Sequence, residues 1–194
     1  MNAPLIPKGV AYVPLDGAVG TEQVTFVLLP NLSMLAFTSA IEPLRIANQL
    51  TGKPLYEWRT VSEDGQPVRC SNGVEIVVDV ALNEATTTGS VFVCSGVEPD
   101  GSSSQRVADW IRRQWRGGRK VGGLCTGAYT LAKAGILEDK VFTLHWENIA
   151  PFRESYPELD PREQMAQFYA ANWPLFAPGL TSMRVTGRCS ASRS

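Results

Sequence analysis

The sequence predicts an α/β sandwich built around a mainly parallel β-sheet. Several short runs are apolar on both faces, which is typical of central strands in a parallel sheet. These runs alternate along the chain with segments of helical periodicity, as in repeated strand–helix–strand units with right-handed crossovers. A chain of 194 residues is long enough for one such domain with a sizeable core.

The overall composition excludes several classes of protein. Hydrophobic residues make up 44% of the chain and charged residues 19%, which is too apolar for a disordered chain. Eighteen basic and nineteen acidic residues leave no general basic field, which argues against a stand-alone nucleic-acid-binding protein. No apolar stretch is long enough to span a bilayer. Residues 1–22 lack the pattern of a signal peptide and predict a flexible N-terminal arm, so we expect a cytoplasmic protein.

The first elements after the arm are a strand, a helix and a second strand. The run VTFVLLP (24–30) predicts a buried strand, and YEWRTVS (56–62) predicts another strand. The helix between them begins after Asn31 or Ser33 as its cap. Pro43 lies inside this helix and predicts a kink or a break.

The middle of the chain predicts two further strands and an amphipathic helix. GVEIVVDV (73–80) alternates in part between apolar and polar residues, and VFVCSG (91–96) is a buried-type run. ALNEAT (81–86) is compatible with a short helix. In QRVADWIRRQWRGG (105–118), apolar residues recur at helical spacing and arginines occupy much of the remaining face. We interpret the basic stretch 112–120 as the solvated face and end of this helix.

The last part of the chain predicts two more strands and two more helices, followed by an atypical tail. The strands are KVGGLC (120–125) and VFTLHW (141–146), and the helices are TGAYTLAKAGIL (126–137) and ENIAPFRESYP (147–157). From about residue 165 no helical or strand period is visible. We therefore expect a core domain over 23–164 and a tail over 165–194 that lies outside it.

The strongest local signal is the G-x-C-x-G pattern of Gly123, Cys125 and Gly127, where a predicted strand meets a predicted helix. This pattern is the thiol form of a nucleophile elbow. Such a turn forces its central residue into an uncommon backbone conformation, and glycine neighbours let the chain turn without clashes. Free N–H groups at the helix start favour a thiolate and can hold an anion or a carbonyl oxygen. Cys125 is therefore a nucleophile or part of a ligand cradle, or else a buried residue at a strand end.

Histidine and cysteine counts restrict the chemistry further. His145 is the only histidine, so a Cys–His pair must use it, and a multi-histidine metal centre is excluded. The four cysteines contain no CxxC pair, so neither a zinc site nor a compact disulfide framework is predicted. We expect no metal and no cofactor. His145 is either a pocket residue that faces Cys125 or a hydrogen-bonded structural residue at a strand end.

Residues 24–160 resemble the N-terminal domain of AraC-type transcriptional regulators whose sensor is similar to DJ-1/PfpI proteins and class I glutamine amidotransferases. The stretches that carry this resemblance are VTFVLLPNLSMLAFTSAIEPLRIANQL, YEWRTVSEDGQPVRCSNGVEI, VFVCSG, GLCTGAYTLAKAGILEDKVFTLHWE and FRESYPELD. The likeness is greatest to the subgroup that senses arginine, carnitine or glycine betaine. The resemblance implies a flavodoxin-like three-layer sandwich, a regulatory role and a homodimer.

The chain departs from the family pattern in four places. Thr126 follows the elbow cysteine where PfpI-type hydrolases have histidine, and Ala36 stands where DJ-1-like proteins have an acidic residue against the thiol. Both departures argue against hydrolase-type catalysis. Residues 165–194 do not match the family, and we hypothesise that they come from another reading frame. The helix-turn-helix pair that binds DNA in these regulators is missing, so we expect DNA binding only through a C-terminal domain that this chain lacks.

The candidate ligand-binding residues follow the first strand, the elbow strand and the helix after it, because ligands of open α/β sheets bind at the carboxyl ends of strands. Trp146 would supply an aromatic wall for a quaternary ammonium group, worth ~0.5–2 kcal/mol per contact. Phe37 fits the core equally well, and a pair with Arg45 explains Glu42 more simply than a ligand contact does. The candidates are Asn31, Ser33, Phe37, Cys125, Thr126, His145 and Trp146.

These observations lead to one main hypothesis and two alternatives. The main hypothesis is a non-enzymatic sensor domain that binds a small amino-acid-like or quaternary ammonium metabolite around Cys125. The first alternative is a cysteine hydrolase or amidase, with Cys125 as nucleophile and His145 as base. The second alternative is a redox-sensing thiol at Cys125.

Overall fold

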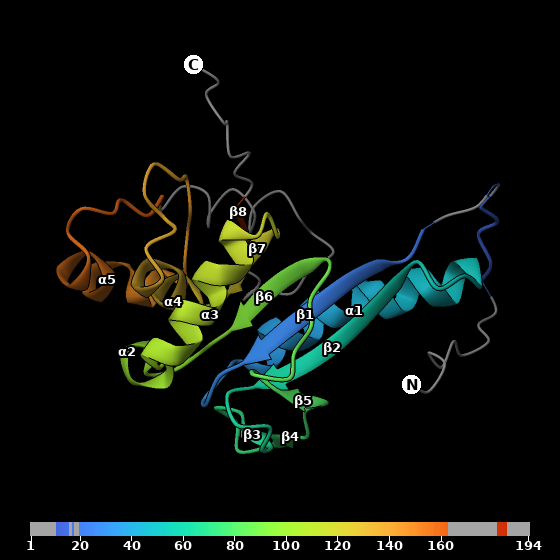
Figure 1. Ribbon diagram of the computed structural model, residues 1–194, viewed down its shortest axis with the longest axis horizontal. Helices are drawn as coiled ribbons and strands as arrows, with labels where there is room; N and C mark the ends of the chain where they lie inside the picture. Colours follow the sequence, from blue (N-terminus) through green and yellow to red (C-terminus); the bar gives the residue numbers. More distant parts are fainter. Residues whose placement is uncertain (1–10, 16, 18–19, 163–181, 186–194) are drawn as a thin grey trace.

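Helices cover both faces of one sheet, which gives the protein a three-layer α/β architecture (Figure 1). The computed structural model describes residues 11–15, 17, 20–162 and 182–185. The strand order is β5-β2-β1-β6-β7-β8; all neighbours are parallel except β8, which runs antiparallel to β7. The predicted α/β sandwich with a mainly parallel sheet is therefore confirmed. The strands are β1 (Glu22–Leu28), β2 (Tyr56–Ser62), β5 (Val80–Ala81), β6 (Ser90–Cys94), β7 (Val121–Leu124) and β8 (Ser182–Val185).

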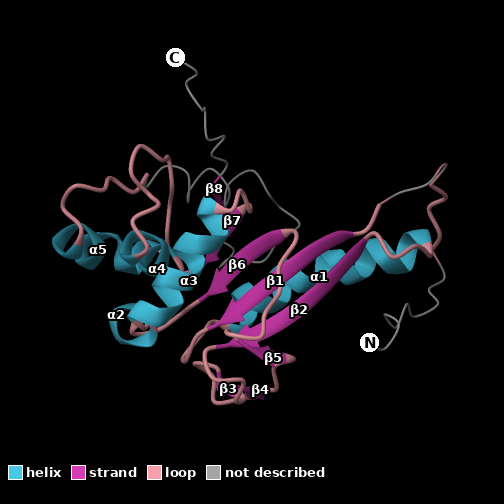
Figure 2. Ribbon diagram, viewed as in Figure 1, coloured by secondary structure: helices cyan, strands magenta, loops and turns pink. Residues whose placement is uncertain are grey.

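The central strand β1 contributes to two separate cores because its side chains are apolar on both faces. Phe26 and Leu28 pack in one core with α1 (Met34–Thr51), which passes behind β1 and β2 in Figure 2. Val27 points to the opposite face, since successive side chains of a strand alternate. It joins the core formed with the helices of the other layer. Those helices are α3 (Gln105–Arg116), α4 (Ala128–Lys133) and α5 (Ile149–Ser155).

The long helix α1 is continuous over 18 residues, so the predicted break at Pro43 is wrong, while the alternative of a kink stays a prediction. Proline removes one backbone hydrogen bond from a helix, but packing holds α1 on both sides of that position. Ser33 caps its start, and Phe37 is buried in its first turns. Near its end the Asn48 side chain forms hydrogen bonds with both the carbonyl and the N–H of Tyr56.

The segment 73–80 is not a single strand, contrary to prediction. It contributes β4 (Glu75–Ile76), which pairs antiparallel with β3 (Val68–Arg69), and it then begins the edge strand β5. A tight turn closes this small hairpin. Asn72 Oδ1 accepts a backbone N–H bond from two residues further on at 3.1 Å, and Gly73 has a φ of 87°. Residues 73–80 therefore form part of a short hairpin and the start of β5 instead of one continuous strand.

The segment 141–146 is also not a strand, although a strand was predicted there. Phe142 and Leu144 are fully buried, but the backbone is irregular and leads into the 3-10 turn η1 (Trp146–Asn148). The place beside β7 is taken by β8, which pairs along the whole of β7. Within the described residues, Phe142 and Leu144 are therefore buried without a strand partner.

β8 lies in the tail that we expected outside the core. Four residues of 165–194 join the sheet as its edge strand, which differs from the expectation, and the rest of the tail lies outside the described residues. β8 has only four residues, too few to stand out as a strand period in the sequence, which explains the miss. Two short segments differ as well: 81–86 contains a turn rather than a helix, and a predicted loop holds α2 (Pro99–Ser102).

The described part of the N-terminal arm lies along the end of α1. Val13 N–H donates a hydrogen bond to Leu50 O at 2.7 Å. Lys53 Nζ donates to the carbonyl oxygens of Leu15 and Gly17. These contacts tie the described residues of 11–17 to α1, while 1–10 lie outside the described residues. In the part of the chain that the structure describes, no helix has the length and apolarity needed to cross a membrane.

Candidate functional site

The loops after β1 and β6 form one unit at the carboxyl edge of the sheet. Ser33 N–H donates to Ser95 O at 3.1 Å, and Val97 N–H donates to Asn31 O at 3.1 Å. Gly96 lies between these bonds, where a Cβ atom would stand only 2.2 Å from Asn31 O. Only glycine fits so close an approach of two backbones, so this residue fixes how the two loops cross.

Left-handed backbone conformations gather at the same edge. In the described residues, Asn31, Glu98 and Cys125 have φ values of 59°, 56° and 57°, and they follow β1, β6 and β7 respectively. Asp139, with a φ of 56°, is the one other described non-glycine residue of this kind. Each such conformation costs about 1–3 kcal/mol and clusters at functional sites in proteins. The edge around Cys125 is therefore the best candidate site.

Cys125 occupies the sharp turn that the G-x-C-x-G pattern predicted. β7 ends at Leu124, whose carbonyl accepts the Gly127 N–H at 3.0 Å just before α4 begins. A Cβ atom at Gly127 would be 2.6 Å from Val93 O, and one at Gly123 would be 2.8 Å from the carbonyl carbon of Gly127. Close backbone contacts therefore require both glycines, and the predicted bend is confirmed.

The Cys125 thiol is half-buried, and its surroundings disfavour the thiolate. Burial raises the pKa of Cys125, the backbone N–H of Thr126 lowers it by a smaller effect, and the negative charge of Glu147 raises it. The thiol is therefore neutral at pH 7, which corrects the expectation of a favoured thiolate.

His145 contacts the elbow through its backbone. Its N–H donates to Cys125 O at 3.4 Å, while the imidazole Nδ1 lies 3.7 Å from a carboxylate oxygen of Glu147. The ring of Trp146 lies 5.9 Å from the imidazole centroid, and this tryptophan is 68% exposed. The structure thus places the His145 backbone at the elbow, with Trp146 and Glu147 beside the His145 imidazole.

Three predicted site residues also hold the fold together. Thr126 is 1% exposed, and its Oγ1 donates to Gly96 O at 2.6 Å, which ties the elbow to the β6 loop. The hydroxyl of Ser33 accepts a hydrogen bond from the N–H of Ala36 at 3.3 Å as the cap of α1. Phe37 is buried beside Phe26, with ring centroids 5.5 Å apart. Direct ligand contact by these three residues stays a prediction.

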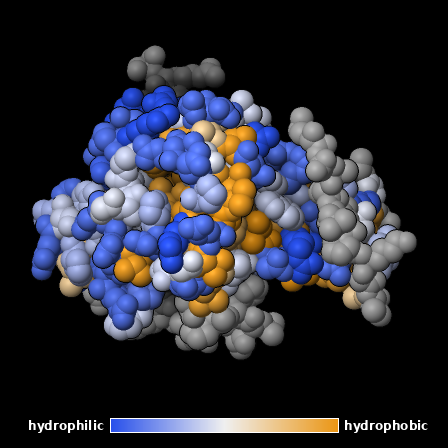
Figure 3. Space-filling model, turned by 90° about the horizontal axis from the view of Figure 1, so that it is seen from below, coloured by the Kyte–Doolittle hydropathy of each residue, from blue (hydrophilic) through white to orange (hydrophobic). Residues whose placement is uncertain are grey.

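Sequence reasoning missed Gly96, Glu147 and the apolar rim of this edge. The glycine at the end of VFVCSG was a usable signal, because glycine at a strand end marks close backbone approach. Glu147 stands two residues after the only histidine, but nothing local indicated its direction. Leu35, in the first turn of α1, and Val97, in the loop after β6, are 49% and 58% exposed at the same edge. Figure 3 shows apolar surface near the middle of the face seen from below, toward which β1 and β2 run in Figure 1.

Other parts of the described chain offer weaker candidates for a site. Among the described residues, no group of three or more His, Cys, Asp or Glu side chains is placed to hold a metal ion. Glu42 forms an exposed ion pair with Arg45 at 2.7 Å, as the simpler interpretation predicted. A cavity of about 380 Å³ lies at the opposite, amino edge of the sheet, away from Cys125. Its walls are formed by Thr21, Glu22, Gln23, Thr88, Gly89, Ser90, Gly118, Arg119 and Lys120.

Comparison with known proteins agrees with this architecture. The chain is 41% identical over 140 residues to the HTH-type transcriptional regulator CdhR of Pseudomonas aeruginosa, covering 72% of this chain and 41% of that protein. It is 38% identical over 138 residues to the HTH-type transcriptional regulator GbdR of the same species, covering 71% of this chain and 38% of that protein. The chain therefore spans about two fifths of the length of these curated relatives.

A solved structure and a family model extend the comparison. The crystal structure of an AraC family transcriptional regulator from Pseudomonas putida matches with a TM-score of 0.64 and 27% identity, covering 73% of this chain and 76% of that chain. The model of the DJ-1/PfpI family matches residues 24–156, from the first strand to the end of α5. Because this match takes in the sheet, the elbow and most of the described residues, the chain belongs to the DJ-1/PfpI family.

Proposed function

We propose that this chain is the effector-sensing part of a transcriptional regulator, with its ligand site at the Cys125 elbow. The observation that carries the proposal is the meeting of the loops after β1, β6 and β7 beside a half-buried thiol. The relatives are HTH-type transcriptional regulators, and this domain accounts for about two fifths of each. Operator binding then belongs to the remaining part of such a protein, which acts in the cytoplasm where bacterial DNA lies.

The state of the thiol favours binding over hydrolysis. A cysteine nucleophile reacts as the thiolate, and enzymes lower its pKa with a neighbouring histidine or other cation. Here burial and Glu147 raise the pKa of Cys125, and the imidazole of His145 lies beside Glu147. Thr126 stands where the hydrolases have histidine, and its hydroxyl bonds to Gly96 instead. A neutral thiol at such an elbow is suited to shape and line a pocket.

The rim of the elbow fits a ligand with a compact positive charge. Trp146 offers an exposed aromatic face, and the carboxylate side chain of Glu147 is 60% exposed beside it. An aromatic face and a carboxylate both attract an ammonium, guanidinium or quaternary ammonium group. Exposed Leu35 and Val97 supply apolar contacts for its carbon skeleton. We therefore propose a small amino-acid-like or quaternary ammonium metabolite as the effector.

We also propose that the chain forms a homodimer. A ligand can regulate the protein only by shifting it between states for which its affinity differs, and two arrangements of a dimer would provide such states. On α1, Leu35 and Ile46 are 49% and 42% exposed and lie on one side of the helix at 3.6 residues per turn, whereas Ile41 and Leu44 pack against the core. A second copy of the chain would cover this apolar surface. The start of α1 lies at the ligand edge, so a shift of the loop after β1 would reach that surface.

Thermal unfolding with candidate effectors tests the proposed function. Arginine, carnitine or glycine betaine at millimolar concentration is expected to raise Tm, since a ligand at a hundred times its Kd adds about 2.7 kcal/mol to the unfolding free energy. Trp146→Ala and Glu147→Gln should remove most of this gain, whereas Glu84→Gln, an exposed acid elsewhere, should keep it. No stabilisation of the folded parent by any of the three would contradict the proposed ligand class.

A cysteine hydrolase is the second candidate function, because a φ of 57° at Cys125 is the backbone conformation of a nucleophile elbow. In this alternative His145 acts as base for Cys125. Turnover of an activated ester or amide that falls more than about a hundredfold in both Cys125→Ser and His145→Gln would support hydrolysis. Equal background rates in the parent and both variants would rule against it.

A further inference from the structure

The most basic part of the chain lies on α3 and the loop after it. Residues 105–120 hold six basic side chains and one acidic side chain, whereas the rest of the chain holds twelve basic and eighteen acidic ones. A chain with a net charge of −1 thus concentrates a charge of +5 on α3 and the loop after it. Five of the six cations are arginines, whose planar guanidinium binds phosphate and carboxylate oxygens bidentately.

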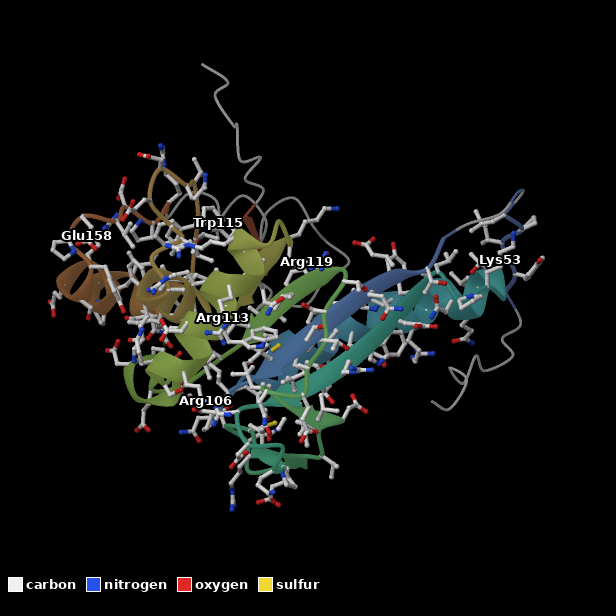
Figure 4. The ribbon with its side chains drawn as sticks, in the orientation of Figure 1. Lys53, Arg106, Arg113, Trp115, Arg119 and Glu158 are labelled. Atoms are coloured by element: carbon white, nitrogen blue, oxygen red, sulfur yellow. The ribbon has the colours of Figure 1, made fainter. Side chains whose placement is uncertain are left out.

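These arginines share one side of the helix. At 3.6 residues per turn, Arg106, Asp109, Arg112, Arg113 and Arg116 fall within an arc of about 120°. Figure 4 shows the labelled arginines of this stretch following α3 from its first turn to the loop beyond its end. The opposite side of α3 is buried in the core through Val107, Ala108, Trp110 and Ile111. We call Arg106, Arg113 and Arg116, all of which are exposed, the basic face of α3.

The fold alone does not account for this basic face. Arg112 pairs with Asp109 at 3.2 Å, but none of the ion pairs within the described residues involves Arg106, Arg113 or Arg116. The helix dipole favours Arg113 and Arg116, which lie in the last turn. It disfavours Arg106, because the first turn of a helix prefers negative charge, and α3 has no acidic residue there.

We infer that the basic face of α3 binds the phosphate backbone of double-stranded DNA. The helix rises about 15 Å from Arg106 to Arg116, a length that matches about four phosphates along one strand. Arg119 and Lys120 continue the positive charge to the amino edge of the sheet. Phosphate contacts carry no base information, so this face would add affinity to operator binding and leave sequence recognition to another part of the protein.

We favour DNA over an acidic protein as the partner because the domain is proposed to be part of a transcriptional regulator. This inference rests on that part of the proposed function but not on the proposed ligand site. In the relatives, the same domain is joined to the rest of an HTH-type regulator, so DNA bound by that regulator is held close by. Tethering raises the effective concentration of the DNA at this face, so even weak phosphate contacts increase the overall affinity of the regulator for DNA.

Salt-dependent DNA binding by the full 194-residue chain tests the inference. Fluorescence anisotropy with a short labelled duplex should give a Kd of about 10⁻⁴–10⁻⁶ M at physiological salt, and the affinity should fall as salt rises. Arg106→Gln, Arg113→Gln and Arg116→Gln combined should reduce the slope of log K against log salt by about 2.7, or 0.9 per lost contact. The matched control removes three cations elsewhere, at Lys53, Lys140 and Arg162, and should keep the parent slope.

Three results would overturn the inference. They are an unchanged slope in the α3 variant, an equal loss in the control variant, and tighter binding of polyglutamate than of DNA, which would assign the face to an acidic protein. Replacing the same three arginines by lysine should restore most of the slope, which separates lost charge from a damaged fold. Metabolite-induced stabilisation should be unchanged in the α3 variant, so failure of the ligand site and failure of this inference are distinguishable.

Discussion

At position 125 the backbone has a φ of 57°, a conformation that costs a residue with a side chain about 1–3 kcal/mol. Gly123 and Gly127 make the turn possible, and because they are sequence neighbours of Cys125 the turn was predictable. The glycine at position 96 signalled a close backbone approach but not its partner Asn31, and the electrostatic effect of Glu147 on the thiol had no local signal. The residues next to Cys125 therefore predicted the bend. The groups around its sulfur could be identified only from the structure.

The close approach at Gly127 gives a direct stability prediction. In Gly127→Ala the new Cβ would stand 2.6 Å from Val93 O and 2.8 Å from the Cα of Gly123, so backbone must move. We expect a loss of about 1–3 kcal/mol or more in unfolding free energy, measured by urea denaturation. Gly101→Ala is the control, because its Cβ would meet nothing within 4 Å. Equal stabilities of the two variants would disprove the tight elbow.

The raised pKa of Cys125 predicts how its reactivity depends on pH. Alkylation by iodoacetamide should be slow at pH 7 and should rise with a midpoint above the ordinary thiol pKa of about 8.5. Because the folded protein holds this proton more tightly than the unfolded chain, the unfolding free energy should fall as pH rises past that value.

The Glu147→Gln variant tests the cause of this shift. Removing the negative charge that raises the pKa of Cys125 should move the alkylation midpoint to lower pH. Glu84→Gln, which removes an exposed charge elsewhere, should leave the midpoint where it is in the parent. Peptide mass spectrometry would follow Cys125 separately from the other cysteines. A midpoint that is the same in all three proteins would show that Glu147 does not act on the thiol.

Among the helices and strands, the predictions were accurate where the sequence has a clear hydrophobic period bounded by turn residues. β2 was predicted at its observed bounds, and α3 differed only at its end, because the period of each is bounded by turn residues. The strand predicted at 141–146 was wrong because an apolar run indicates burial but does not indicate whether the segment pairs with a strand. β8 was missed because its four residues are too few to stand out as a strand period.

The continuity of α1 through Pro43 predicts a stabilising substitution. Pro43→Ala would restore a backbone N–H to the helix interior, and we expect a gain of about 1–2 kcal/mol after the greater freedom of the unfolded chain is subtracted. Differential scanning calorimetry would measure the gain, with Ser39→Ala in the same helix as the control. A loss of stability would mean that Pro43 serves a local bend in α1.

For the whole molecule, the topology separates three surfaces. The carboxyl ends of β1, β6 and β7 carry the candidate ligand site, α1 carries apolar surface on one face of the sheet, and α3 carries the basic face on the other. Each surface matches one need of a regulator: an effector, a second copy and DNA. α1 begins beside the site, so a change at the ligand edge has a direct route to the proposed dimer surface.

Protection of Cys125 from alkylation by a bound metabolite tests the central claim most directly. The rate of iodoacetamide labelling at Cys125 would be measured by peptide mass spectrometry with and without the metabolite that raises Tm, and with glutathione as a control for the reagent. A saturating ligand at the elbow should slow labelling of Cys125 at least about tenfold, in proportion to site occupancy. A metabolite that stabilises the protein but leaves the Cys125 rate unchanged would place the effector elsewhere and contradict the account.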